Sequence, residues 1–109
     1  MATEKNTQSG NTTMLVLKLL KEKDMYGYQI IDELAQKSQN VFHLKTGTLY
    51  PLLHGLEKSG MVTSYDQPTD TQRVRKYYSI TSAGKSALVQ KQAEWETYST
   101  AVQQVMIYA

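Results

Sequence analysis

Apolar residues recur at helical spacing in several segments of the chain. Residues 14–20 are apolar on nearly every side, so a helix there must be covered on more than one face. Residues 26–37 carry their apolar side chains on one stripe and polar side chains on the other. Leucines spaced like one face of a helix fill residues 46–58, and Gly60 follows as a stop signal. The pattern therefore predicts three helices, and Thr81 is placed to cap a fourth that runs to about residue 107.

Two runs rich in β-branched and aromatic residues follow the third helix. They are residues 61–65 and 74–80, and the turn-forming segment 66–72 separates them, which predicts a hairpin. The succession of three helices, two strands and a long helix is an α+β plan, in the order of a winged helix-turn-helix with the hairpin as its wing. We expect a flexible N-terminal tail at residues 1–11, a winged helix-turn-helix domain at residues 12–80 and a C-terminal dimerisation helix at residues 81–109.

A proline interrupts the leucine pattern of the third helix. Inside a helix, Pro51 removes a backbone donor and crowds the carbonyl four residues earlier, at a cost of about 3 kcal/mol. The cost is smaller if the helix has only just begun, as it has with Thr46 or Thr48 as N-cap. In a winged helix-turn-helix the third helix enters the DNA major groove with its N-terminus first. We therefore expect this N-terminal turn to face a bound partner.

The composition limits the class of protein. The 109 residues are 40% apolar and 20% charged, which is typical of one globular domain, and the net charge of +2 is only compatible with nucleic acid. The sequence has no cysteine, no apolar run that could span a bilayer and no signal-peptide pattern at its start, so we expect a cytoplasmic protein. No catalytic triad, glycine-rich phosphate loop or metal-ligand spacing stands out, and we expect neither an enzyme nor a cofactor or metal.

Three blocks of sequence together carry a family resemblance. They are MYGYQI at residues 25–30, TGTLYPLLHGLEKSGMV at residues 46–62 and RKYYSITSAG at residues 75–84. In these blocks the chain resembles the PadR-family transcriptional regulators, and the similarity covers nearly everything after residue 12. The long last helix, with no further helical domain, is similar to the short subclass of that family. The resemblance implies a bacterial, homodimeric repressor that releases an inverted-repeat operator when a phenolic, drug-like or other small effector, or a cellular signal, intervenes.

The outward side of the third helix and the second strand of the hairpin carry the residues that we expect to contact double-stranded DNA. Hydroxyl groups suit phosphates and base edges, and basic side chains suit phosphates. The expected contacts are Lys45, Thr46, Thr48, Tyr50, His54, Lys58, Arg73, Arg75 and Lys76. Some alternatives stay open: Tyr50 as a partly buried packing residue, His54 as a solvated histidine, and the basic strand residues as a solvated face. Gly27 either approaches a phosphate or allows close helix packing.

The last helix carries an apolar seam at alternating steps of three and four residues, with Lys91 as its exception. A seam of this kind on a long helix needs a partner. The first helix, which must be covered on more than one face, offers a complementary surface. We expect a homodimer interface at Leu17, Leu88, Trp95, Tyr98, Val102 and Val105. Two copies of Trp95 across a two-fold axis could also clamp a small planar aromatic effector between Leu17, Trp95, Tyr98 and Val102, although Trp95 as plain core remains the alternative.

A protein-binding module is the rival interpretation, because winged helices also serve as interaction scaffolds and a fold does not fix a function. The arginines of the hairpin and the outward threonines favour DNA instead.

Overall fold

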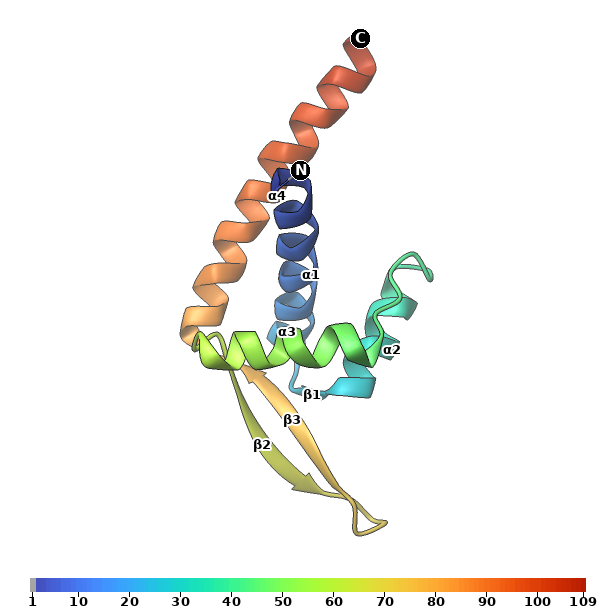
Figure 1. Cartoon of the computed structure of the whole chain (residues 1–109), viewed down its shortest axis with the longest axis vertical. Helices are drawn as coiled ribbons and strands as arrows, with labels where there is room; N and C mark the ends of the chain where they lie inside the picture. The colour runs from blue at the N-terminus through green and yellow to red at the C-terminus, as the bar shows by residue number, and fades with distance from the viewer. Residues whose placement is uncertain (1) are drawn as a thin grey trace.

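The computed structural model describes the backbone of residues 2–109 and the side chains of residues 11–109. Four helices and a small sheet make up an α+β fold with the winged helix-turn-helix order (Figure 1). The elements are α1 (Ala2–Glu22), β1 (Met25–Tyr26), α2 (Gly27–Lys37), α3 (Thr46–Lys58), β2 (Val62–Pro68), β3 (Val74–Ile80) and α4 (Ser82–Tyr108). None of the helices in the described part of the chain is long and apolar enough to cross a lipid bilayer.

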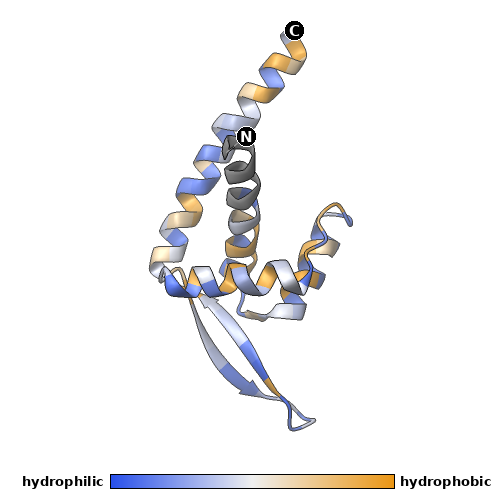
Figure 2. Ribbon diagram, viewed as in Figure 1, coloured by the Kyte–Doolittle hydropathy of each residue, from blue (hydrophilic) through white to orange (hydrophobic). Residues whose placement is uncertain are grey.

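The core lies where α1, α2, α3 and the base of the hairpin meet. Apolar side chains from α1 contribute most to it, because several consecutive positions of that helix are buried, as its all-round apolar pattern predicts. Apolar residues concentrate at this junction and again along the last turns of α4 (Figure 2). The buried cluster comprises Val16, Leu17, Leu19, Leu20, Met25, Ile30, Leu34, Leu49, Leu53, Leu56, Val62, Tyr78 and Leu88.

The sheet has three antiparallel strands in the order β1-β3-β2. In the hairpin Val62 faces Ile80 and Pro68 faces Val74, so β2 runs three residues further than the predicted strand at 61–65. Strand β1 was missed by the sequence prediction, which gave Tyr26 to the second helix. The two residues of β1 have no periodicity of their own, and they become a strand only because Met25 and Tyr26 pair with Tyr78 and Tyr77.

The boundaries of α2, α3 and α4 match the sequence pattern closely, with one correction at the cap of α3, whereas α1 begins well before the predicted first helix. Thr81 caps α4 as predicted, and its hydroxyl accepts from the backbone N–H of Gly84 at 3.0 Å. The N-cap of α3 is Lys45, not Thr46 or Thr48, and its side chain makes no capping hydrogen bond. The helix therefore begins at Thr46, directly after its cap, and Pro51 lies in its second turn.

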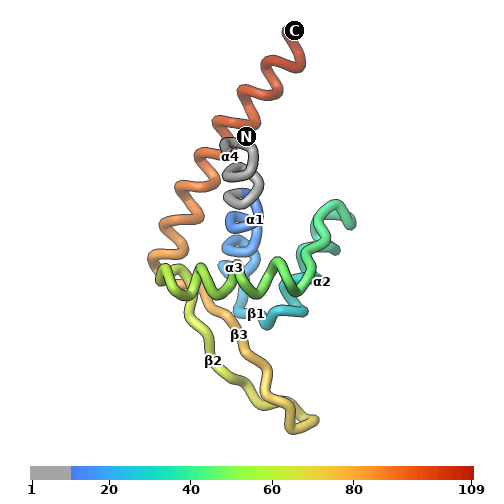
Figure 3. Tube along the Cα trace, viewed as in Figure 1, coloured from blue at the N-terminus to red at the C-terminus, as the bar shows by residue number. Residues whose placement is uncertain are grey.

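The N-terminal tail predicted at residues 1–11 falls largely outside the described side chains. The backbone of α1 begins at Ala2, within that segment, and the predicted flexibility of the tail stays a prediction. At the other end of the chain, α4 crosses beside α1 and then continues alone to the C-terminus (Figure 3).

Candidate nucleic-acid interface

The first turn of α3 is open to solvent. Lys45, Thr46, Gly47 and Thr48 are all exposed, and apart from its own helix backbone and chain neighbours no described residue lies within 4 Å of the Cβ position of Gly47. The carbonyl of Lys45 accepts from the N–H groups of Thr48, at 3.0 Å, and Leu49, at 2.9 Å. The turn is thus closed by its own backbone, while its two threonine hydroxyls remain available to a ligand.

The opposite side of α3 anchors the helix to the core. Leu49, Leu53 and Leu56 are buried, whereas His54 and Lys58 are exposed on the outward side, as predicted. Glu57 is the acidic residue of α3, and one of its carboxylate oxygens accepts from the hydroxyl of Ser64 at 2.5 Å.

Tyr50 has a packing role that one of the open alternatives described. It is half-buried, and a Cβ built on Gly27 would overlap with its hydroxyl and ring. The glycine at the start of α2 therefore allows α3 to pack closely, which also decides the two alternatives for Gly27 in favour of packing. Tyr50 belongs to the candidate interface as a wall residue more than as an exposed contact.

The wing carries exposed basic side chains that form no ion pair with any described acid. Arg73, Arg75 and Lys76 are exposed, and the ion pairs among the described side chains involve only residues of α1, α2 and the turn between them. Gln67 lies opposite Arg75 in the hairpin and Asp66 opposite Lys76. The acid at position 66 therefore faces the lysine and leaves the arginines uncompensated.

The tip of the wing is held by local hydrogen bonds. The N–H of Thr69 donates to the carbonyl of Arg73 at 2.9 Å, and the Thr69 hydroxyl donates to the same oxygen at 2.8 Å. Gln72 adopts a φ of 64°, in the left-handed region that turns use. These contacts fix the backbone that carries Arg73.

A row of tyrosines crosses the face of the sheet that looks away from the core. The rings of Tyr65 and Tyr77 stack with centroids 5.8 Å apart, and Tyr77 meets Tyr26 edge-on at 5.4 Å. The guanidinium of Arg75 lies over the Tyr26 ring, 4.3 Å from its centroid. At the other end of the row the Tyr65 hydroxyl donates to Asp24 at 2.7 Å, and this hydrogen bond is the main cause that raises the pKa of Tyr65 above 10.0.

These tyrosines were not predicted from the sequence to be part of a site. Tyr65, Tyr77 and Arg75 share one face of the hairpin by the two-residue period of strands, and that period was a usable signal. Tyr26 could not be found in this way because β1 was not predicted.

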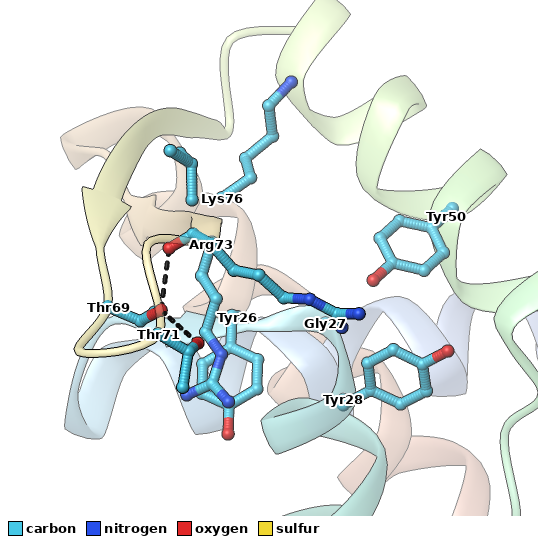
Figure 4. A pocket seen from close by; sticks show the side chains of 10 residues that line it. Tyr26, Gly27, Tyr28, Tyr50, Thr69, Thr71, Arg73 and Lys76 are labelled. Carbon is cyan, nitrogen blue, oxygen red and sulfur yellow. Dashed lines mark hydrogen bonds between the residues drawn. The ribbon is translucent and has the colours of Figure 1, made fainter.

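The arginines and tyrosines surround a hollow of about 400 Å³ between the wing, β1, α2 and α3. We name it the tyrosine hollow and define it by Tyr26, Gly27, Tyr28, Tyr50, Arg73 and Arg75. Arg73 reaches from the wing toward the space between Tyr28 and Tyr50, whereas Lys76 points away from these rings (Figure 4). None of the described aspartates and glutamates lines the hollow.

The seam of the last helix divides into a buried and an exposed part. Leu17 and Leu88 are 0% and 1% exposed, because both belong to the chain's own core, so their assignment to a dimer interface was wrong and Leu17 cannot line an effector site. Trp95, Tyr98, Val102 and Val105 are between 40% and 62% exposed. The rings of Trp95 and Tyr98 lie 6.0 Å apart at a tilt of 33°.

A comparison with protein families decides which regulators this arrangement belongs to. The model of the transcriptional regulator PadR-like family matches residues 16–90, which run from within α1 to within α4 and include every element between them. The chain belongs to the PadR-like family.

Solved structures of PadR-like and other transcriptional regulators share the fold. A transcriptional regulator from Clostridium thermocellum is 35% identical, with a TM-score of 0.80 over 87% of this chain and 92% of its own. A PadR family regulator from Clostridium difficile is 31% identical, with a TM-score of 0.73 over 86% of this chain and 96% of its own. Among curated proteins, a transcriptional regulator of Mycobacterium tuberculosis is 35% identical over 69 residues, which are 63% of this chain and 61% of that protein.

As a PadR-like protein the chain is a regulator of transcription with DNA as its partner. Of the predicted contacts, the fold brings Tyr50 of α3 and Arg73, Arg75 and Lys76 of the wing together around the tyrosine hollow. The other predicted contacts are exposed on α3 or directly before it: Lys45, Thr46, Thr48, His54 and Lys58. None of the described side chains forms a cluster of three or more histidines or acids that could hold a metal ion.

Proposed function

We propose that the chain is a homodimeric, sequence-specific DNA-binding regulator that represses transcription by occupying an inverted-repeat operator. The first turn of α3 enters the major groove, where Thr46 and Thr48 meet base edges or phosphates. The wing follows the phosphate backbone beside it. A regulator that acts on DNA in a bacterium works in the cytoplasm, which is the location we propose.

One observation supports this proposal most strongly. The basic side chains at the edges of α3 and in the wing are exposed and form no ion pair among the described residues: Lys45, Lys58, Arg73, Arg75 and Lys76. Positive charge left without a partner on one interface suits phosphates, which attract it at any sequence.

The homodimer is supported by the second half of α4. All its large apolar side chains from Trp95 to Tyr108 are exposed, as is typical of a surface that a partner covers, and a second copy of the same helix is the simplest cover. Two copies related by a two-fold axis place two α3 helices at half-sites about 34 Å apart, which is one turn of DNA.

The salt dependence of binding tests the proposal. The full-length protein should bind duplex DNA with an affinity that falls steeply between about 50 and 200 mM salt. Thr48→Ala should weaken binding to an operator selected from a random library by about 1 kcal/mol and leave random duplexes nearly unaffected, because a base-edge contact carries the sequence preference. Ser86→Ala, which removes an exposed hydroxyl from α4, is the matched control.

Two results would count against the proposal. Little binding to any duplex at low salt would favour the protein-binding module, and equal losses on both sequences would make Thr48 a positioning contact.

For the effector we propose a small planar aromatic molecule held at the dimer axis by Trp95, Tyr98 and Val102. Their exposure in the single chain and the 6.0 Å spacing of the two rings support it. Binding there would spread the two α3 helices and lower the affinity for the operator. Titration of planar aromatic compounds should quench the single tryptophan, and equal affinity of the Trp95→Ala variant, measured by calorimetry, would contradict this site.

A further inference from the structure

In the tyrosine hollow, Arg75 already contacts a side chain of its own domain. A surface arginine could bind a phosphate without such a contact. Long basic side chains on a strand normally sample many rotamers and lose that freedom when they bind. Arg75 instead lies 4.3 Å above the Tyr26 ring, and Tyr26 is held edge-on by Tyr77 at 5.4 Å. The guanidinium therefore has a contact within its own domain that favours one position.

The support for Tyr26 continues across the whole sheet. Tyr77 stacks on Tyr65, whose hydroxyl donates to Asp24 in the turn that follows α1. The row thus connects the hairpin, through Tyr65 and Tyr77, to Asp24 and Tyr26 of the segment between α1 and α2. Arg75 lies at the free end of this row, and its N–H groups can still donate to a ligand, since a cation over a ring does not use them.

The chemistry of the hollow selects an anion with several acceptor oxygens. Arg73 and Arg75 line it, no acid among the described side chains does, and the tyrosines around it offer hydroxyl donors. A guanidinium pairs best with planar or tetrahedral oxyanions. The hollow opens between α3 and the wing, the two elements that face DNA in the proposed function, so the oxyanion nearest to it is a backbone phosphate.

We propose that the tyrosine hollow seats one phosphate of the DNA backbone, with Arg73 and Arg75 as its cationic contacts and Tyr26 as the positioning residue that orients Arg75. The proposal rests on the proposed function and adds to it a defined phosphate site. Tyr26 itself need not touch the DNA, because its contribution passes through Arg75.

A double-mutant cycle on the full-length protein tests this division of roles. Binding to a fluorescein-labelled duplex of random sequence is followed by anisotropy over a range of salt concentrations. Arg73→Ala and Arg75→Ala should each lower the salt slope by about one, as the loss of one phosphate contact does. Lys85→Ala removes an exposed charge from α4, outside the hollow, and should leave the slope unchanged.

The positioning role of Tyr26 has a separate signature. Tyr26→Leu should weaken binding by about two- to five-fold with no change in salt slope, because it removes the ring but no charge. In the Arg75→Ala background the same change should have no further effect. Tyr26→Phe, which keeps the ring, should bind like the wild type.

Tyr26→Leu could destabilise the fold, so a second variant, Arg75→Lys, tests the same contact from the arginine side. Arg75→Lys keeps the charge and loses the flat stacking surface, so it should retain the salt slope and lose affinity by a similar factor. Unfolding curves of every variant accompany the binding data.

Several results would overturn the proposal. If Tyr26→Leu lowered the DNA affinity equally in the wild-type and Arg75→Ala backgrounds, the tyrosine would have a merely structural role. If the salt slope were unchanged in the arginine variants, no phosphate would bind in the hollow. Binding of inorganic phosphate at micromolar concentration, lost in Arg75→Ala, would assign the hollow to a free phosphorylated ligand instead. If the wild type bound no duplex at any salt, the proposed function itself would be wrong. If the wild type bound DNA and the arginine variants bound it equally well, only the phosphate site would be wrong.

Discussion

At the scale of single residues, the contact of Gly27 with Tyr50 determines how closely α2 and α3 pack. Gly27→Ala should lower the free energy of unfolding by about 1–3 kcal/mol, because a Cβ there overlaps with the tyrosine. Gly55→Ala is the matched control: nothing lies within 4 Å of its Cβ position on α3, and alanine should stabilise that helix by up to about 1 kcal/mol. Urea unfolding measures both, and a neutral Gly27→Ala would show that the ring moves aside at no cost.

Two tyrosines make the stability depend on alkaline pH. Burial, followed by the charge of Glu57, raises the pKa of Tyr78 above 10.0, and the bond to Asp24 raises the pKa of Tyr65. The folded state therefore keeps protons that the unfolded chain loses, so their contribution is fully present below about pH 10 and is lost as the pH rises through the folded values. Urea midpoints between about pH 9 and 11 should fall more steeply for the wild type than for Tyr78→Phe. Parallel slopes would contradict the assignment to Tyr78.

At the scale of elements, Pro51 destabilises α3, as expected from the sequence. Pro51 lies within the helix, so the carbonyl of Gly47 has no N–H four residues on. Pro51→Ala should raise the free energy of unfolding by about 1–2 kcal/mol, after the greater freedom of the unfolded alanine chain is subtracted. Pro68→Ala, at the end of the edge strand β2, should change little. Thermal melts compare the two, and equal shifts would mean that α3 accommodates the proline without strain.

The elements also show how far the sequence could be read. Long amphipathic segments were predicted within one to three residues because α2, α3, β3 and α4 each carry a strong period. The strand β1 was not predicted because a segment of two residues has no periodicity. The lysine cap of α3 was not predicted because its side chain makes no capping hydrogen bond. Leu17 and Leu88 were assigned to the wrong surface because a sequence pattern shows that a side chain needs covering but not which chain covers it. The tyrosine hollow depends on contacts between residues far apart in the sequence, such as Tyr26 and Arg75, which no local pattern encodes.

At the scale of the whole molecule, the domain and the second half of α4 should be separable. Truncation after Gln92 removes Trp95 and the exposed apolar residues but keeps Leu88, the buried anchor of α4. The truncated chain should be a folded monomer or an aggregating one, whereas the full chain should sediment as a dimer at micromolar concentration. Val89→Ala, an exposed change on the domain half of α4, should leave the dimer intact. A truncated chain that remains dimeric would place the interface elsewhere.

The solitary course of α4 beyond the domain has a consequence for dosage. When each copy of an operator needs two chains and the second half of α4 finds its cover only in a partner, the DNA-competent species grows with the square of the chain concentration while the protein is scarce. Occupancy of a promoter then rises more steeply than the amount of protein. A cell that lowers expression two-fold would lose about four-fold of the active species, so a small change in synthesis or degradation is enough to open or close a gene.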